Sequence, residues 1–277
     1  MDKGGKYSVS ETARGRWNLL DLIGAVGRKA VPTYIFSEVD ATWAEELQRN
    51  YEQAGRQISF NAILLKAIGV AQREHPLSRT VALPWGRTAL LNDIVAGFTI
   101  ERYIDEGTNP SVFLGSIESP DHKSIEDITR ELNNMAEADI DSVPQFERQS
   151  DFLELPHYVR RLMLWSGLRD PEFRLHYINA TFTLTSISKY GCKLLVPPSV
   201  CTSTFGVGSI EERAVVKEGR IVARPIFCLT LNFDHHVIDG APAARFLKDI
   251  CDLLEGGLEN HLEPELQSLS RPSTSTN

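Results

Sequence analysis

The chain has 277 residues, of which 42% are hydrophobic and 24% are charged, and this length and balance suffice to bury one large core. Its formal net charge of −8 argues against nucleic acid as a partner, because phosphate binding needs clustered Lys and Arg. No run reaches the ~18–20 apolar residues of a membrane-spanning helix, and the first residues lack the apolar region of a secretory signal. We therefore expect a cytoplasmic protein without membrane or nucleic-acid partners, and an organelle matrix stays open as its location.

The cysteines give no sign of a disulfide framework or a metal site. The four of them form no C-x-x-C pair and no metal-ligand spacing. At least two lie in apolar surroundings, where a free buried thiol is the ordinary interpretation. The set is Cys192, Cys201, Cys228 and Cys251.

Hydrophobic periodicity and turn signals predict one compact α/β domain. Helices are expected over residues 16–27, 43–54, 60–74, 124–138, 158–168 and 241–255. Strands are expected over residues 33–40, 85–91, 94–100, 111–117, 179–186, 203–210 and 225–233. Two hairpins are predicted, one around Asn92-Asp93 and one across residues 217–219. The acidic segment 139–158 fits neither periodicity.

The predicted domain has a polar segment on each side. Residues 1–15 are polar and are expected to be flexible. Residues 16–255 contain all the periodic segments and are expected to form the folded domain. Residues 256–277 form a polar tail, which we expect to be disordered.

The densest group of titratable residues lies where the buried strand 225–233 passes into the helix 241–255. A neutral imidazole in this position can take a proton from a thiol or a hydroxyl at neutral pH. A carboxylate four residues later can fix the tautomer of the ring, or hold the local backbone through an Arg. A glycine next to it allows the tight turn before the helix. The residues concerned are Asp234, His235, His236, Asp239 and Gly240.

Two plainer interpretations of the same residues stay open. A metal site is conceivable, but adjacent side chains at a strand end point to opposite faces, so both histidines cannot easily reach one ion. Asp239 can instead be a structural N-cap of the following helix, with the two histidines solvated.

The segment 234–241, D-H-H-V-I-D-G-A, followed by A-R-F-L at 244–247, resembles the end of the catalytic domain of dihydrolipoyl acyltransferases, the core subunits of 2-oxoacid dehydrogenase complexes. Chloramphenicol acetyltransferase shares this fold and its H-x-x-x-D-G motif. Residues 181–191 resemble the family's T-F-T-[IL]-S-x-x-G-x-x-G segment, and 205–210 resemble its strand ending in G-V-G. The resemblance covers residues 16–255 in order and is strongest over 180–255.

This resemblance implies a fold, a reaction and a set of site residues. The implied fold is a chloramphenicol acetyltransferase-like two-layer sandwich, with a mixed β-sheet flanked by helices. The implied reaction moves an acyl group from a thioester, such as acyl-CoA, to a thiol or hydroxyl acceptor, without an acyl-enzyme. His235, four residues before Asp239, is the implied general base, while His236 stands where the dihydrolipoyl enzymes usually carry Arg.

The resemblance also assigns the residues around the histidine. The hydroxyl that donates to the oxyanion maps to Thr185, where the family mostly has Ser, and Ser186 is the fallback. A β-branched residue such as Thr185 is also an ordinary strand residue. Asp239 is expected to position the histidine loop through Arg16 or Arg28, and Ser186 and Gly240 are expected to contact substrate.

The chain also departs from the dihydrolipoyl enzymes. Its N-terminus has no room for a lipoyl domain, N-P-S-V-F-L-G at 109–115 replaces the family's G-L-x-V-P-V strand, and its tail is polar where the family's is apolar. The aromatic-rich residues 144–178 have no clear counterpart. These departures favour a free-standing homotrimer that uses coenzyme A, with dihydrolipoamide as an alternative substrate and no metal. The resemblance implies that the active site lies between subunits of the trimer. An acyltransferase that acts on a lipoyl domain supplied by another chain, and a non-catalytic scaffold of the same fold, are the other hypotheses.

Overall fold

The structure, a computed structural model, describes residues 17–26, 30–103, 110–139, 142–167, 170–262 and 265–266. Its α-helices are α1 (Trp17–Val26), α2 (Thr42–Gln53), α3 (Phe60–Glu74), α4 (Ile125–Glu137), α5 (Pro144–Glu154), α6 (His157–Gly167), α7 (Pro171–Ile178) and α8 (Gly240–Leu254). Its strands are β1 (Pro32–Asp40), β2 (Thr80–Leu83), β3 (Arg87–Leu90), β4 (Val95–Tyr103), β5 (Pro110–Glu118), β6 (Phe182–Ser186), β7 (Ser203–Val207), β8 (Glu211–Lys217) and β9 (Arg220–Asp234).

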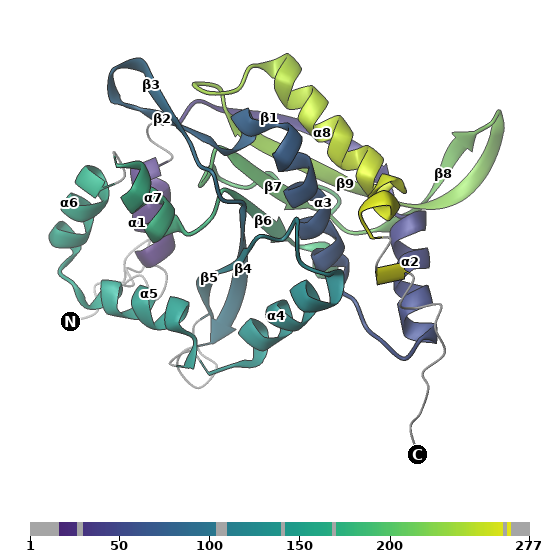
Figure 1. Ribbon diagram of the computed structural model, residues 1–277, viewed down its shortest axis with the longest axis horizontal. Coiled ribbons are helices and arrows are strands. Elements are labelled where there is room, and N and C mark those ends of the chain that lie inside the picture. Colours follow the sequence, from purple (N-terminus) through teal and green to yellow (C-terminus); the bar gives the residue numbers. More distant parts are fainter. Residues whose placement is uncertain are drawn as a thin grey trace, which may run out of the picture.

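A mixed sheet of seven strands forms the centre of the molecule, in the order β1-β9-β7-β6-β4-β5, with β8 also paired to β9. The pairs β4–β6 and β6–β7 are parallel, and the other pairs are antiparallel. The 15-residue strand β9 pairs with β8 through its first half and with β7 through its second half, while β1 lies along its other edge. Figure 1 shows the hairpin of β8 and β9 projecting from the body of the fold.

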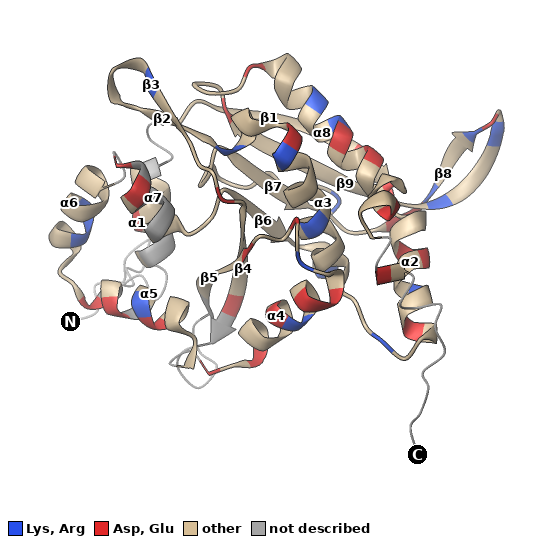
Figure 2. Cartoon of the chain, viewed as in Figure 1, with Lys and Arg blue, Asp and Glu red and all other residues tan. Residues whose placement is uncertain are grey.

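Helices α2, α3, α4 and α8 cover one face of this sheet (Figure 1). Alternate strand residues point into the layer between sheet and helices, and there they form the main core with the apolar sides of the helices. Strands β6 and β7 carry no charged residue, whereas Figure 2 marks acidic and basic residues along the helices and the β8–β9 hairpin. The core residues of the middle strands are Phe182, Leu184, Phe205, Val207, Leu229, Leu231 and Phe233.

Helices α1, α5, α6 and α7 form a second group at the β5 end of the sheet (Figure 1). They have a small core of their own, which includes Leu22 of α1, Leu164 of α6 and Ile178 of α7. Arg160 of α6 donates from Nε to Asp21 Oδ2 of α1 at 2.9 Å, and both side chains are almost fully buried. A buried ion pair therefore joins the two outer helices of this group.

Helix α5 closes the edge of the sheet through two glutamine side chains. The Gln149 amide accepts from Leu114 N at 3.1 Å and donates to Leu114 O at 2.7 Å. The Gln145 amide accepts from Ser116 N at 3.0 Å and donates to Ser116 O at 3.5 Å. The two amides, one helical turn apart, thus occupy backbone groups that an edge strand would otherwise leave unpaired.

The predicted fold class, a mixed sheet flanked by helices, is confirmed. The predicted hairpin between residues 85–91 and 94–100 is wrong, because β3 pairs with β2 and not with β4. The chain turns at Trp85 and Gly86, whose φ values of 60° and 70° are both left-handed. A tryptophan rarely adopts this conformation, so the sequence did not indicate a turn there.

Two other regions differ from the expectation. The segment 139–158, which fitted no pattern, contains α5, and residues 171–178 form the unpredicted helix α7. Beyond Glu255, where we predicted the folded domain to end, Gly257–His261 form a short 3-10 helix, and Leu258 and Leu262 are fully buried. The packed part of the chain therefore reaches at least Leu262, because these two leucines complete the main core.

Candidate active site

The segment after β9 is fixed by the side chain and the carbonyl of Asp234. Its carboxylate accepts from the backbone N–H of Val31 at 3.2 Å and of His236 at 3.0 Å. Its carbonyl accepts from Val237 N at 3.0 Å and Ile238 N at 3.1 Å, and Ile238 is buried in the core. These bonds hold the loop in a tight turn before α8 begins at Gly240.

His235 lies at the outer side of this turn. Its N–H donates to Val31 O at 2.9 Å, and its ring lies 5.9 Å from the Phe233 ring. Its Nδ1 atom is 3.7 Å from Asp239 Oδ1, and 42% of the His235 side chain is exposed. This separation permits electrostatic attraction but is longer than a hydrogen bond. The imidazole is thus anchored through its backbone and remains open to a reacting molecule.

Asp239 and Gly240 do not have the local structural roles that the sequence suggested for them. Asp239 stands at the N-cap position of α8, but its side chain makes no cap hydrogen bond and is 84% exposed. Asp239 thus occupies the N-cap position, as one interpretation expected, but does not cap the helix through its side chain. Gly240 has no left-handed φ, and a Cβ there would meet no atom within 4 Å. The turn does not require a glycine, and open space lies in front of it.

The second histidine has a different partner. His236 Nδ1 is 3.0 Å from Asp234 Oδ1, so its ring is tied to the carboxylate that organises the turn. The two adjacent histidines thus lie beside two different carboxylates. Within the described residues no three His, Cys, Asp or Glu side chains are placed to hold a metal ion.

The predicted oxyanion donor lies on the sheet face opposite the main core. Thr185 of β6 is half-buried, and its hydroxyl is 3.5 Å from the hydroxyl of Thr99 on β4. The Ser186 hydroxyl lies 3.1 Å from the Ser188 hydroxyl, so it is engaged within its own loop. No role was assigned to Thr99 from the sequence. The alternation of residues along β4 is the signal that places its side chain on this face of the sheet.

The strand register places Thr185 and His235 far apart. Thr185 is level with Gly206 of β7, and Gly206 is level with Thr230 of β9. His235 lies five residues further along β9 and its turn, which corresponds to ~16 Å at about 3.3 Å per residue. One chain therefore brings His235 and Asp239 together but keeps Thr185 out of reach of the imidazole.

The predicted arginine partners of Asp239, Arg16 and Arg28, lie outside the described residues. None of the described helices is both long and apolar enough to cross a membrane.

Residues 174–262 match the family model of the 2-oxoacid dehydrogenases acyltransferase catalytic domain. The acetyltransferase component of the pyruvate dehydrogenase complex of Bacillus subtilis (strain 168) is 25% identical over 79% of this chain and 44% of its own length. The succinyltransferase component of the 2-oxoglutarate dehydrogenase complex of Bartonella vinsonii is 23% identical over 79% of this chain and 47% of its own length. The chain spans under half the length of these curated relatives.

A solved structure shows the same fold. The dihydrolipoamide acetyltransferase of Azotobacter vinelandii superposes with a TM-score of 0.70 and 21% identity, over 94% of this chain and 95% of the other. The segment from β6 to α8, with His235 and Asp239, lies inside the residues that match the family model. The predicted resemblance is therefore confirmed, and the chain has the fold of a 2-oxoacid dehydrogenase acyltransferase catalytic domain.

Proposed function

Starting from a chain with the fold of these acyltransferases, we propose that it moves an acyl group from acyl-CoA to a thiol or hydroxyl acceptor, with His235 as general base. The observation that carries the proposal is the geometry of the turn after β9. Its backbone is fixed by Asp234, while the His235 ring is exposed and lies 3.7 Å from Asp239. A general base needs this combination of a fixed position and access to the acceptor.

In the proposed reaction the His235 imidazole takes the proton of the acceptor, whose sulfur or oxygen attacks the carbonyl carbon of the thioester. The carbonyl π electrons move to oxygen, and the Thr185 hydroxyl donates a hydrogen bond to this oxyanion. When the C–O double bond reforms, the C–S bond breaks and the thiolate of coenzyme A takes the proton from the imidazolium. The attraction of the Asp239 carboxylate, 3.7 Å away, stabilises the imidazolium between the two steps.

The separation of His235 and Thr185 within one chain supports a site built from two chains. A span of ~16 Å along β9 is too long for a histidine and a hydroxyl that must both contact one tetrahedral centre. A second copy that presents its own Thr185 to His235 satisfies both requirements. We propose a homotrimer, because a head-to-tail contact of this kind closes into a ring.

Exposed apolar side chains beside His235 support this assembly. Val31, which accepts the His235 N–H, is 49% exposed, and Tyr34 and Phe36 on the edge strand β1 are 42% and 61% exposed. Leu194 and Val196 are also exposed, in the loop that crosses the same face of the sheet at Pro197, where Pro197 O accepts from Asn232. Exposed apolar residues that gather near a proposed site are a common feature of interaction surfaces.

The relatives bear on the chemistry in a limited way. The Azotobacter vinelandii structure was determined to study a serine, a histidine and an asparagine four residues later in the catalytic mechanism of that enzyme. The same spacing separates His235 from Asp239 here. The curated relatives are named for lipoyl-lysine acyl transfer, so a lipoyl domain supplied by another chain is the second candidate acceptor. An assay of acyl transfer from acyl-CoA to dihydrolipoamide, in which formation of the new thioester is measured, detects transfer in either case.

The decisive test compares two adjacent histidines. We expect His235→Ala to lower kcat by at least ~10²–10⁴-fold, the usual contribution of a general base, without dissociating the trimer. His236→Ala is the matched control, because the His236 ring is bound to Asp234 and not beside Asp239. Its activity should fall by less than about threefold, as surface substitutions usually have small effects. Full activity of His235→Ala contradicts the proposal. Absence of coenzyme A binding by calorimetry favours the non-catalytic scaffold.

A further inference from the structure

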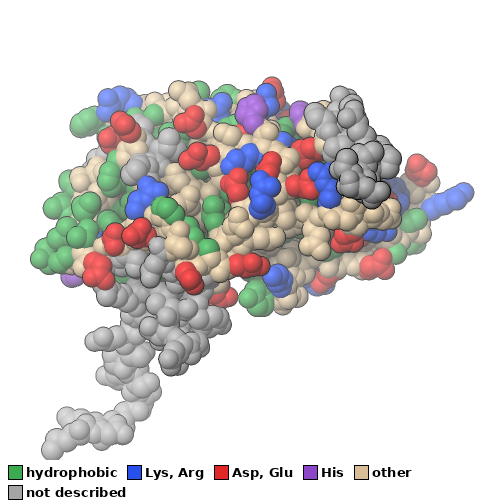
Figure 3. Space-filling model, turned by 60° about the horizontal axis from the view of Figure 1, so that its bottom comes forward, with side chains coloured by type: hydrophobic (Ala, Val, Ile, Leu, Met, Phe, Trp, Pro, Cys, Tyr) green, Lys and Arg blue, Asp and Glu red, His purple; other side chains and the backbone are tan. Residues whose placement is uncertain are grey.

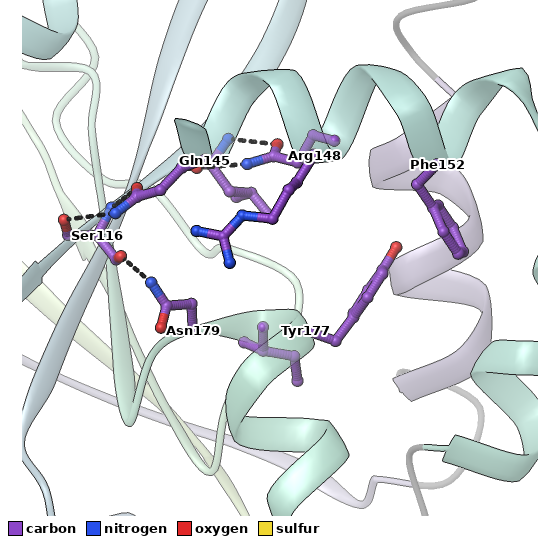
Figure 4. Close-up of a pocket in the computed structure, with 9 residues that line it drawn as sticks. Ser116, Gln145, Arg148, Phe152, Tyr177 and Asn179 are labelled. Carbon is purple, nitrogen blue, oxygen red and sulfur yellow. Dashed lines mark hydrogen bonds between the residues drawn. The ribbon is translucent and has the colours of Figure 1, made fainter. Parts of the chain in front are cut away.

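A cavity of about 140 Å³ lies between the edge strand β5, helix α5 and helix α7. Figure 4 shows side chains from all three elements facing into it. Six of its nine lining residues lie in the aromatic-rich segment 144–178. The lining residues are Leu114, Ser116, Gln145, Arg148, Gln149, Phe152, Tyr177, Ile178 and Asn179.

The walls of this cavity are held in place. The Gln145 and Gln149 amides bind the backbone of Ser116 and Leu114 and so fix α5 against β5. The Asn179 side chain donates to the Ser116 hydroxyl, which ties the end of α7 to the same strand. The cavity is therefore pre-formed, as binding sites for small molecules usually are.

Arg148 gives the cavity its charge. Its Nε atom donates to Pro144 O at 3.1 Å, and its guanidinium group points between Asn179 and Tyr177 into the cavity (Figure 4). No carboxylate of the described residues forms an ion pair with Arg148. A guanidinium in this position offers a planar set of N–H donors to a carboxylate.

The other walls are mostly apolar. Leu114, Phe152, Ile178 and the ring of Tyr177 line the cavity, while Arg148 itself is an exposed residue at its edge. Burial raises the pKa of Tyr177, with the nearby Asp21 carboxylate adding to the effect, so the phenol stays neutral and does not repel an anion. The lining therefore fits a ligand with an apolar body and one carboxylate.

The strand register connects this cavity to the proposed oxyanion donor. Leu114 of β5 is level with Thr99 of β4, and the Thr99 hydroxyl is 3.5 Å from the Thr185 hydroxyl. The three side chains thus lie in a row across neighbouring strands on one sheet face. Two strand spacings, ~10 Å, separate Thr185 from Leu114 in the cavity wall, so only an acyl chain of medium length or longer reaches the cavity from the oxyanion donor.

We infer that the cavity holds the distal part of the acyl group, and that this group is a medium-length chain ending in a carboxylate bound by Arg148. This inference rests on the proposed acyl transfer. In it, Thr185 and the cavity belong to the same chain, so one subunit binds the acyl group at both ends. The neighbouring subunit supplies His235.

The test uses two acyl-CoA donors of equal length, hexanoyl-CoA with a neutral end and adipoyl-CoA with a carboxylate end, and dihydrolipoamide as acceptor. Arg148→Gln should lower kcat/KM for adipoyl-CoA by about 10- to 100-fold, the worth of a hydrogen-bonded charge, and leave hexanoyl-CoA unchanged. Arg49→Gln is the matched control, because its Nε atom also donates to the carbonyl one turn earlier on an exposed helix face. It should change neither donor.

Binding separates this inference from the proposed function. Calorimetry of adipoyl-CoA in the His235→Ala background, with and without Arg148→Gln, requires no turnover. Tighter adipoyl-CoA binding that depends on Arg148 supports the inference even if transfer is absent. Equal effects of Arg148→Gln on both donors, or no effect on either, overturn it. An effect that appears instead when dihydrolipoate replaces dihydrolipoamide also overturns it, because the carboxylate would then belong to the acceptor.

Discussion

The segment from β6 to α8 and the group of α1 with α5–α7 are held together in different ways. The first buries apolar side chains of β6, β7 and β9 against α8, with Phe205 and Phe246 in edge-to-face contact at 5.9 Å. The second has a small apolar core and depends on polar contacts, which are the buried Arg160–Asp21 pair and the amides of Gln145 and Gln149. Figure 3 shows hydrophobic side chains gathered on the outer surface at the end where α6 lies.

In the proposed function, the first region supplies the catalytic residues and the second supplies the cavity that selects the acyl group. The first region positions His235 and Asp239 and matches the family model. Of the second, only residues 174–178 at the end of α7 fall within that match, and the group adds a cavity beside the row of side chains that ends at Thr185. In the proposed reaction, the second region selects the acyl group and the first transfers it.

The largest expected effect comes from breaking the buried ion pair. Asp21→Ala removes the buried carboxylate that Arg160 Nε binds, and breaking a buried ion pair by removing one partner typically costs about 3–5 kcal/mol. We expect hydrogen exchange to show loss of protection in α1 and α6 first, with the sheet retained. Asp21→Leu with Arg160→Met is the control, because replacing a whole buried pair by apolar residues is often neutral. If Asp21→Ala unfolds the whole chain in one step, the two regions are not distinct.

In the main core, the expected pH effect is somewhat smaller. Burial raises the pKa of the Cys251 thiol from 9.0 to about 11. The unfolded chain loses this proton first as the pH rises, so the contribution to stability is fully present below pH 9 and is lost through about pH 11. The loss is on the order of 2–3 kcal/mol. Urea unfolding of the wild type and Cys251→Ala at pH 8 and pH 10.5 measures it, and an equally steep pH dependence in the variant contradicts the assignment.

The smallest effect is expected at the edge of the sheet. Gln149→Ala leaves the N–H and C=O groups of Leu114 without their partner, and we expect a loss of about 1–2 kcal/mol because water can replace part of it. Hydrogen exchange at Leu114 and Ser116 should accelerate. Gln48, whose amide donates to Ile58 O away from the sheet edge, provides Gln48→Ala as control. Unchanged exchange at Leu114 in Gln149→Ala means that α5 does not depend on this contact.

The sequence predicted the first region well because its structure follows from apolar periodicity. The strand 225–233, the helix after it and the hairpin of β8 with β9 all lie where the pattern placed them. His235 and Asp239 were found by their spacing and lie together. Alternation on β6 placed Thr185 on a strand face. The large distance between Thr185 and His235 depends on the strand register, so no local sequence pattern shows it; the need for a second subunit came only from the family resemblance.

The second region was predicted poorly for a physical reason. Gln145 and Gln149 act through backbone groups of β5, about thirty residues earlier in the chain, and Arg160 acts through Asp21, 139 residues earlier. Such pairs leave no periodic signal, since each depends on the tertiary fold. The left-handed Trp85 is a comparable case, because its conformation contradicts the local preference.

The central claim is that His235 and Thr185 of different subunits form one site, and mixed trimers test it directly. His235→Ala and Thr185→Ala should each be nearly inactive, the second by about 10²–10³-fold. Each mixed trimer then contains one intact site in three, so a random one-to-one mixture, assembled together, should recover about one quarter of wild-type activity. Recovery near this value supports a site shared between chains. Activity no higher than the sum of the two inactive variants contradicts it.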